Sequence, residues 1–571
     1  KTNTQVEGVD EADLVKTDGQ YLYQANQNRI VVMKAYPPED MQITQIIEYK
    51  NNFYPQELYL DDQHLVVVGS SVTLPPVYTQ DSAKKMPELY PSLSAQQVVK
   101  AIIYDLTDKT NIQQIREIEV EGSYISSRKI HSALYLVTNR NIDRYYIQQY
   151  SEIPSYRDTA VGNDPIGIDY ANIRYFPNCL QANYLIVAGC DLVNPSQGTH
   201  VSTFLGSGEG IYVSPQNMYI VASKTIWRPM TSDSSNLESK QNKIISPRYN
   251  QESEVYKFAL SSGKINYIGK GVVPGNILNQ FSMDEYQDYF RIATTTGEVW
   301  RTDEYTSKNH VYVLDSKLNI IGRLENIAPG ETIYSTRFMG ERLYMVTYKN
   351  TDPLFAIDLK DPQKPTVLGA LKIPGYSDYL HPYDNNHLIG FGKDTVEVSE
   401  KDQRGNEINR SAYYQGMKIA LFDVSDVSNP IQLFSEIIGD RGTDSELLRN
   451  HKALLFDRDQ HLLAFPITVM EAKKDANPAS ERRLAMQYGN FTFQGAYVYH
   501  LDLESGFHLQ SKITHLSASD YLHSGNTWYN SDKNIERVIY INNNIYSLSK
   551  CLVTAHSLPD FKECGMLSLL Y

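Results

Sequence analysis

Short apolar stretches recur along the whole chain, most with Tyr, His or Phe near the start and small polar residues at the end. Nine of them are QYLYQA (20–25), HLVVVGS (64–70), ALYLVTN (133–139), MYIVAS (218–223), YFRIATTT (289–296), RLYMVTY (342–348), HLIGFG (387–392), HLLAFPI (461–467) and NIYSLS (544–549). Their length and their content of β-branched and aromatic residues predict strands rather than helices. We therefore expect an all-β protein.

A second apolar stretch follows each of these and ends in a polar turn, as in AIIYDL (101–106), LFAIDL (354–359) and KIALFDV (418–424). Asp105, Asp358 and Asp423 close these three examples, and a carboxylate at this place is typical of a type I or Asx turn. The alternative is Ca²⁺, but it needs more oxygen ligands than one short turn offers. We expect no metal and no other cofactor.

Two further short stretches complete each unit, so the chain holds nine copies of a four-strand repeat. Four antiparallel strands repeated in this way predict the blades of a β-propeller. A single sheet of this size cannot bury both faces, whereas sheets packed around an axis can. We predict one closed propeller domain over residues 1–571. It has nine blades, or eight if the first and last copies are partial and share one.

The joint between the first two stretches is long in five units, at 71–99, 140–183, 224–253, 393–417 and 468–495. Joints of one kind emerge on one face of a propeller, and long loops on a rigid scaffold often bind partners. The Tyr- and Arg-rich stretches at 141–158 and 167–178 have the composition of interface anchors. The alternative is that these loops pack on one another as a lid over the central channel.

Six basic or His residues fall on the predicted innermost strands, next to the axis: Arg128, Arg337, His381, Arg449, His451 and Arg537. Around a narrow channel they would hold an anionic group, such as a peptide carboxylate or a sugar acid. The alternative is that they pair with neighbouring acids, among them Glu57, Asp378 and Glu446, and join the blades. The acidic opening, residues 6–19, is expected to lead into the first blade and seal the ring where the chain ends meet.

The four cysteines form two local pairs, Cys179 with Cys190 and Cys551 with Cys564. Each pair is separated by about one hairpin, which predicts disulfides between adjacent strands and an oxidising compartment outside the cytoplasm. The alternative is four buried free thiols.

Composition and motifs exclude several function classes. The net charge of −14 disfavours a nucleic-acid partner, which needs a basic surface. No stretch reaches the ~18 apolar residues of a membrane-spanning helix. The sequence has no GxSxG, P-loop or HExxH motif, so the candidates for acid–base catalysis are His381, His451 and nearby acids.

Four longer phrases, at 2–23, 120–138, 376–392 and 450–457, resemble a family of secreted bacterial and archaeal proteins described only as having a C-terminal β-propeller domain. The resemblance covers almost the whole chain. It implies a propeller exported to the cell envelope or beyond, and it implies no particular activity or ligand.

Two functions follow as hypotheses. The first is a binding or scaffold module outside the cytoplasm that engages a protein, peptide or glycan of the cell envelope through the long-loop face. The alternative is a carbohydrate- or peptide-active hydrolase or lyase with its site at the central channel.

Overall fold

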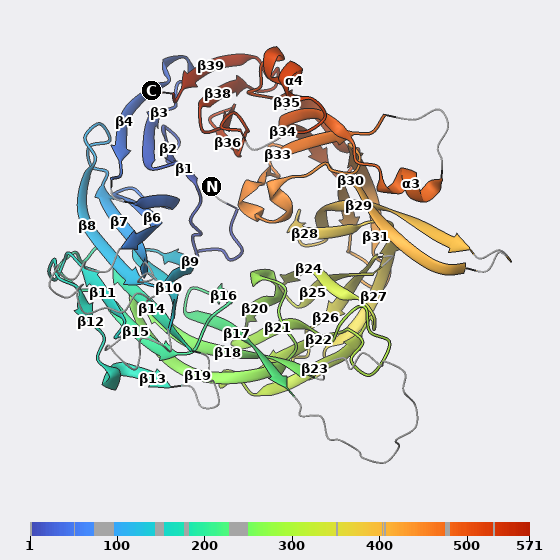
Figure 1. Ribbon diagram of the computed structural model, residues 1–571, viewed down its shortest axis with the longest axis horizontal. Helices are drawn as coiled ribbons and strands as arrows, with labels where there is room; N and C mark the ends of the chain where they lie inside the picture. The colour runs from blue at the N-terminus through green and yellow to red at the C-terminus, as the bar shows by residue number, and fades with distance from the viewer. Residues whose placement is uncertain are drawn as a thin grey trace, which may run out of the picture.

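Nine antiparallel sheets follow one another along the chain and stand around a central axis (Figure 1). The computed structural model describes residues 3–50, 52–73, 96–142, 153–175, 182–227, 249–349, 352–401, 404, 407–473, 480–528 and 531–570. The prediction of a nine-copy propeller of four-stranded sheets is confirmed. The first and last copies do not share a sheet, because each is complete in itself.

The first sheet has four strands, and the second and third carry extra strands at their outer edges. Sheet one is β1 (Val15–Thr17), β2 (Tyr21–Asn26), β3 (Arg29–Lys34) and β4 (Gln42–Glu48). Sheet two is β5 (Phe53–Leu60), β6 (His64–Thr73), β7 (Gln96–Asp105) and β8 (Gln113–Glu121), extended by β11 (Ser155–Asp158) and β12 (Ile166–Gly167). Sheet three is β9 (Ser123–Ile130), β10 (Ala133–Asn141), β14 (Asn183–Asp191) and β15 (His200–Leu205), with β13 (Ile173–Tyr175) parallel to β15.

The next three sheets have four strands each. They are β16 (Gly210–Val213), β17 (Asn217–Trp227), β18 (Tyr249–Ser261) and β19 (Lys264–Pro274); β20 (Met283–Tyr286), β21 (Tyr289–Thr296), β22 (Lys308–Leu314) and β23 (Ile320–Ile327); and β24 (Thr332–Met339), β25 (Arg342–Tyr348), β26 (Asp352–Asp358) and β27 (Thr366–Ile373).

The last three sheets are also four-stranded. They are β28 (Tyr376–Pro382), β29 (His387–Lys401), β30 (Glu407–Asp423) and β31 (Ile431–Ile438); β32 (Leu455–Asp457), β33 (Leu462–Glu471), β34 (Asn490–Asp502) and β35 (Gly506–Ile513); and β36 (Arg537–Ile541), β37 (Asn544–Leu548), β38 (Leu552–Ser557) and β39 (Glu563–Ser568).

Helices are few and short in the described residues. They are the 3-10 turns η1 (Pro38–Asp40), η2 (Tyr170–Asn172), η3 (Gln280–Ser282), η4 (Glu446–Leu448) and η5 (His451–Ala453), and the α-helices α3 (Glu481–Met486) and α4 (Ala518–Ser524). None of the helices in the described ranges is long and apolar enough to cross a membrane.

The hydrophobic core lies between the sheets rather than inside any one of them. Nine buried clusters each draw on two neighbouring sheets, and one of them joins Val31 and Leu22 of the first sheet to Tyr546 and Leu548 of the last. Each sheet therefore depends on both neighbours to bury its apolar faces.

The many tyrosines follow from this arrangement. The Tyr side chains of the second and third strands are buried, and their hydroxyls need a partner there. Several find it on the neighbouring sheet: Tyr219 donates to Glu285 (2.7 Å), Tyr499 to Glu436 (2.8 Å) and Tyr546 to the carbonyl of Ala35 (2.8 Å). The last of these bonds again joins the final sheet to the first.

The repeated Asp turns cap themselves, as expected. Oδ1 of Asp105, Asp358 and Asp423 accepts from the backbone amide two residues on, at 2.8, 3.2 and 2.8 Å. The turns also have a packing role, since Gly322 and Gly369 on outer strands lie against the turn of the next sheet. A Cβ at either glycine would collide with a backbone carbonyl, so these positions require glycine.

The predicted bridge between Cys551 and Cys564 is wrong, since both thiols are free. β38 and β39 run antiparallel, and the Cys551 carbonyl accepts from Leu569, whereas the Cys564 thiol lies beside the carbonyl of Ala555. The two residues sit at opposite ends of the hairpin, about 16 Å apart at ~3.3 Å per residue, far beyond the reach of a disulfide. Cys190 is buried as a free thiol, and Cys179 lies outside the described residues.

Candidate functional site

The N-terminal segment, residues 3–13, crosses the middle of the ring (Figure 1). Its backbone forms bridges to β9 at Asp10 and to β5 at Asp13, and the Asn3 amide donates to the carbonyl of His451 (3.0 Å). The segment leads into the first sheet, as expected. It also occupies the axis, which the sequence pattern did not predict.

Arg537, on the innermost strand of the last sheet, is bound by two carboxylates. Its Nη2 lies 2.8 Å from Asp13 Oδ1, and its Nη1 lies 3.0 Å from Glu446 Oε1. Burial alone would lower the pKa of Arg537, but these two acids raise it above its ordinary value. The side chain is 3% exposed, so this is a buried ionic contact that ties the N-terminal segment to the last sheet.

Glu11 forms the second ionic contact at the axis. Its Oε2 lies 3.1 Å from His451 Nε2 and 3.8 Å from Arg128 Nη2. Burial would raise the pKa of Glu11, but the charge of Arg128 and the hydrogen bond from His451 hold it well below its usual range. Glu11 is therefore an ionised carboxylate placed where an anionic ligand was expected.

Arg337 and His381 lie elsewhere at the axis. The Arg337 guanidinium is 5.4 Å from the ring centre of Phe281, and no carboxylate of the described residues lies within ion-pair distance of it. His381 Nδ1 is 3.0 Å from the hydroxyl of Tyr379. Burial and the charge of Arg337 lower the pKa of His381 to about 3, so this imidazole is neutral at physiological pH.

Arg449 does not reach the axis. Its side chain is 65% exposed, and Nη2 pairs with Asp444 Oδ2 at 2.6 Å. Thus the structure brings three of the six predicted residues to the N-terminal acids, leaves two at the axis and places one at the surface. Ligand binding by Arg128, Arg337, His381, Arg449, His451 and Arg537 stays a prediction.

The acids named as alternative partners have different roles. Glu446 binds Arg537, as that alternative required, while Glu57 binds Lys452. Asp378 forms no ion pair in the described part of the chain; burial and the nearby charge of Asp444 raise its pKa to about 7.

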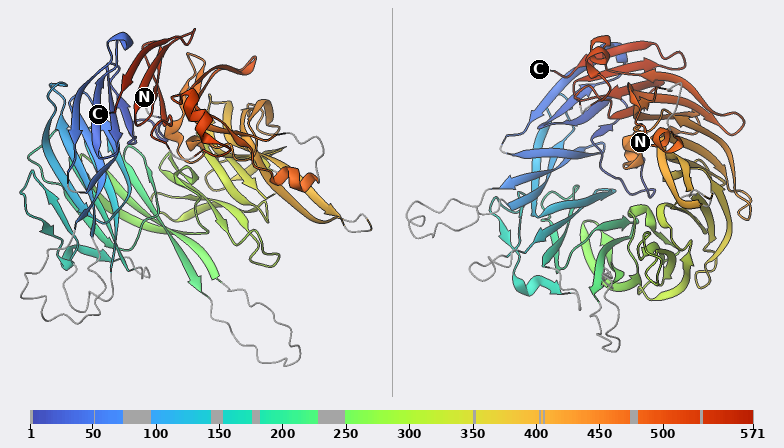
Figure 2. Two further views of the ribbon diagram at one scale, coloured as in Figure 1. Left: turned by 45° about the horizontal axis from the view of Figure 1, so that its top comes forward. Right: turned by 45° about the vertical axis from the view of Figure 1, so that its right-hand side comes forward.

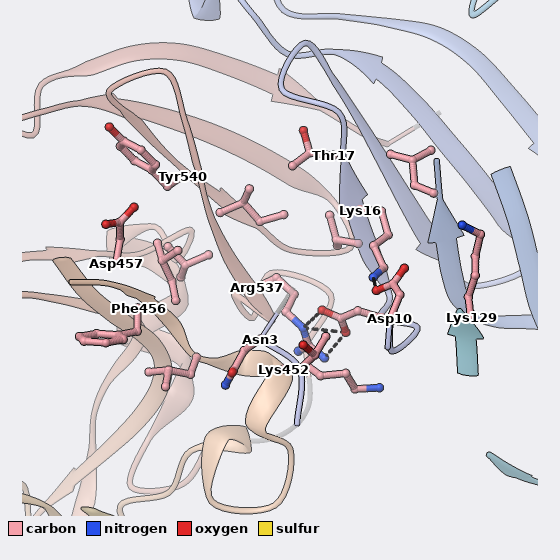
Figure 3. Close-up of a pocket in the computed structure, with 18 of the residues that line it drawn as sticks. Asn3, Asp10, Lys16, Thr17, Lys129, Lys452, Phe456, Asp457, Arg537 and Tyr540 are labelled. Atoms are coloured by element: carbon pink, nitrogen blue, oxygen red, sulfur yellow. Dashed lines mark hydrogen bonds and ion pairs between the residues drawn. The ribbon is translucent and has the colours of Figure 1, made fainter. Parts of the chain in front are cut away.

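A cavity of about 670 Å³ lies beside the N-terminal segment (Figure 3). Its walls come from that segment and from the ends of innermost strands of the first, second, third, eighth and ninth sheets. The polar lining residues are Asn3, Thr4, Asp10, Asp13, Lys16, Thr17, Lys129, His131, Lys452, Asp457, Arg537 and Tyr540. Neither His381 nor His451 lines it, so the proposed catalytic histidines do not face this space.

The cavity and the long connections between the second and third strands of the sheets, the long joints, lie at opposite ends of the sheets. Thr17, Leu60 and Asp457 line the cavity, and each is the last residue of an innermost strand. Because neighbouring strands are antiparallel, the joint between the second and third strands lies at the end where the first strand begins. The β17–β18 and β29–β30 hairpins accordingly leave the ring on the same side (Figure 2).

At the long-joint end, an aromatic and apolar surface is built around Arg441. The Arg441 guanidinium lies 6.0 Å from the ring centre of Tyr413 and 4.7 Å from that of Tyr488, and it donates to the carbonyl of Tyr414 (3.2 Å). Around it, large side chains are open to solvent. We call this the Arg441 surface: Val396, Tyr413, Arg441, Leu484, Met486 and Tyr488.

Part of the long joint 140–183 forms regular structure with the preceding sheet instead of an open loop. Residues 143–152 and 176–181 of the joint 140–183 lie outside the described residues, but β11 adds to the edge of β8 in the preceding sheet. There Arg116 Nη2 meets Asp158 Oδ2 at 2.7 Å, and Asp158 is fully buried. Part of the Tyr- and Arg-rich stretch is therefore structural, while Tyr170 and Tyr175 stay exposed.

The family model described as "Beta propeller domain" matches residues 1–561. The chain belongs to this family. A similar protein is the uncharacterised MJ1554 of Methanocaldococcus jannaschii, 32% identical over 479 residues, which are 75% of this chain and 68% of the relative. An uncharacterised protein of Archaeoglobus fulgidus is 26% identical over 539 residues, covering 82% and 75% of the two chains.

A solved structure, the periplasmic gluconolactonase PpgL of Pseudomonas aeruginosa, aligns with a TM-score of 0.32 at 10% identity, over 68% of this chain and 91% of its own. In the described ranges no group of three His, Cys, Asp or Glu side chains is arranged to hold a metal ion.

Sequence reasoning missed the cavity residues Asp457 and Tyr540 and the surface residue Arg441. A signal was available for the first two, since both lie at the ends of predicted innermost strands. Arg441 lies in a connection between sheets, where the repeat pattern says nothing about side-chain contacts.

Proposed function

We propose that this propeller is an extracytoplasmic binding module that holds a protein or peptide partner of the cell envelope at its long-joint end. The observation that carries this proposal is the Arg441 surface. Four of its side chains are 40–65% exposed: Val396, Leu484, Met486 and Tyr488. Contiguous exposed apolar side chains are uncommon on proteins that act alone, and they mark interaction sites.

The composition and the support of this surface favour binding. Tyr, Met and Arg are enriched at the centres of protein interfaces. Arg441 is held between two tyrosine rings and a backbone carbonyl, so little conformational freedom is left to lose when a partner docks. α3 is fixed as well, because Gln415 donates to the carbonyl of Ala485 (3.0 Å).

The location outside the cytoplasm is supported by the resemblance of the opening and internal phrases to exported propellers. The cysteines no longer support it, since Cys551 and Cys564 form no bridge. Fractionation of the native cells tests the location directly: we expect the protein with the envelope or in the medium, and recovery in the cytoplasm would contradict it.

The binding role is tested by affinity capture from envelope extract with three matched baits: the unchanged protein, Tyr488→Ala and Trp300→Ala. Tyr488 and Trp300 are similarly exposed, at 65% and 68%, but Trp300 lies outside the Arg441 surface. We expect a defined partner with the unchanged protein and Trp300→Ala, and at least a tenfold loss with Tyr488→Ala. Equal capture by all three baits, or a glycan as the sole captured species, would overturn the proposal.

A hydrolase or lyase site at the channel has less support. His451 is engaged by Glu11 at 3.1 Å, and His381 is buried against Tyr379 and absent from the cavity lining. An acid–base catalyst has to reach its substrate.

A further inference from the structure

The axial cavity has one carboxylate whose charge no neighbouring cation balances. Asp457 Oδ1 accepts a hydrogen bond from the backbone amide of Gln460 (3.1 Å), and within the described chain no Lys, Arg or His nitrogen lies within 4.0 Å of this carboxylate. The other lining acids differ: Asp10 lies 2.8 Å from Lys16 Nζ, and Asp13 lies 2.8 Å from Arg537 Nη2.

One aromatic side chain shares this wall with Asp457. Tyr540, on the neighbouring strand β36, lies on the same side of the cavity in Figure 3, and both residues face the space between the eighth and ninth sheets. The Phe456 ring lies on the other face of the eighth sheet, with the ring centres of His381 and Tyr383 at 5.1 and 5.6 Å. A carboxylate beside an aromatic ring attracts a cation, both by charge and through the ring quadrupole.

The opposite wall offers hydrogen-bond donors. Lys129 Nζ pairs with Asp61 Oδ2 at 2.9 Å, and its side chain is 8% exposed. An ammonium group has three N–H donors, so Lys129 can also donate to a ligand. Because Asp61 already balances its charge, an acceptor such as a hydroxyl or a carboxylate suits it.

The cavity also fits a small molecule in size and access. Its volume of about 670 Å³ lies within the ~300–1,000 Å³ usual for ligand pockets. His131, one of its lining residues, is exposed, so the cavity reaches solvent.

We propose that the axial cavity binds a small ligand that carries a primary ammonium group together with hydroxyl or carboxylate acceptors. The ammonium lies against Asp457 and Tyr540, and the acceptors face Lys129. Two sources share this chemistry, an amino sugar and a free amino acid or short peptide. This site is at the other end of the ring from the Arg441 surface, so its test does not depend on whether a partner binds that surface.

The test is calorimetric titration of the full chain at pH 7 with glucosamine, with N-acetylglucosamine and with the dipeptide Ala-Ala. Acetylation removes the ammonium charge and keeps the sugar, so we expect N-acetylglucosamine to bind at least tenfold more weakly than glucosamine. Binding of glucosamine but not of the dipeptide assigns an amino sugar, and the reverse assigns an amino acid or peptide.

Matched variants locate the site. Asp457→Asn keeps the oxygen that accepts from Gln460 but removes the charge, so we expect an unchanged melting temperature and at least a tenfold loss of affinity. Asp459→Asn is the control, because Asp459 is in the same turn, is 85% exposed and does not line the cavity. Tyr540→Leu tests the aromatic ring independently, and we expect it to weaken binding of the ammonium ligand. The proposal is overturned if no ammonium ligand binds, if N-acetylglucosamine binds as well as glucosamine, or if Asp457→Asn binds like Asp459→Asn.

Discussion

The axis and the long-joint rim of this propeller are built in opposite ways. At the axis, charged side chains are buried and paired, as in the contacts of Arg537 with Asp13 and of Arg128 with Glu11. At the rim, aromatic and apolar side chains such as Tyr488 and Met486 are left open to solvent. The charges at the axis hold the N-terminal segment in place, whereas the aromatic and apolar side chains at the rim remain exposed to solvent.

The largest expected effect comes from breaking the axial ion pair. Arg537→Met leaves Asp13 buried without its partner, which we expect to lower the free energy of unfolding by about 3–5 kcal/mol. Arg449→Met is the matched control at the surface, where an exposed pair with Asp444 contributes less than ~1 kcal/mol. Urea denaturation followed by tryptophan fluorescence measures both. Equal free energies of unfolding for the two variants would contradict the conclusion that the axial ion pair stabilises the fold more than the exposed one.

The same experiment addresses domain organisation. One domain over residues 1–571 stays a prediction, and it requires a single transition in which all nine sheets unfold together. Separate transitions for the two halves of the ring would contradict it.

A smaller effect is expected from Asp378, the buried acid of β28. Burial, with a contribution from the charge of Asp444, raises the pKa of Asp378 to about 7 from an ordinary value of 3.8, so the folded state holds this proton more tightly than the unfolded chain does. Its contribution to stability is complete below about pH 3.8 and is lost as the pH rises through about 7. At pH 8 the loss is at most about 4 kcal/mol.

Asp378→Asn removes this titration. We expect the variant to gain stability relative to the unchanged protein as the pH rises from 5 to 8, as measured by thermal melting at each pH. Asp394→Asn is the comparison variant, because burial also raises the pKa of this neighbouring acid. It shows whether the gain in stability between pH 5 and 8 is larger at Asp378 than at another partly buried acid. A constant difference between the Asp378 variant and the unchanged protein at all pH values would refute the assignment.

The smallest effect concerns the last sheet. Because Cys551 and Cys564 are free thiols, a reducing agent should change the melting temperature by less than about 1 °C, whereas loss of a real disulfide typically costs about 2–5 kcal/mol. Alkylation of the unfolded protein without reductant, read by peptide mass spectrometry, should label both residues. An intact Cys551–Cys564 crosslink would show the opposite.

Much of the fold could be predicted from the sequence, because each repeat contains its own strand-forming and turn-forming residues. The strand stretch HLVVVGS became β6, and Asp105, Asp358 and Asp423 cap their turns as the pattern indicated. The joints emerge at the predicted end of the sheets, since their position within the repeat fixes that end. The joint predicted at 393–417 was wrong as a loop, because most of it extends the β29–β30 hairpin.

The candidate sites could be predicted only in part. The innermost position of Arg128, His381 and Arg537 followed from the repeat. Of their partners, only Glu446, which binds Arg537, was among the acids named from the sequence. The cysteine prediction failed for a related reason: separation along the chain does not say which residues face each other, and the register of β38 with β39 keeps Cys551 and Cys564 apart.

The sequence by itself determined the strands, the turns and the number of repeats, because alternation, β-branched content and turn residues act over a few neighbouring positions. Tertiary structure alone decided that the N-terminal segment crosses the axis, that Asp457 faces a cavity beside Tyr540, and that Arg441 contacts both Tyr413 and Tyr488. These contacts join residues far apart in the chain, and only the packing of all nine sheets brings them together.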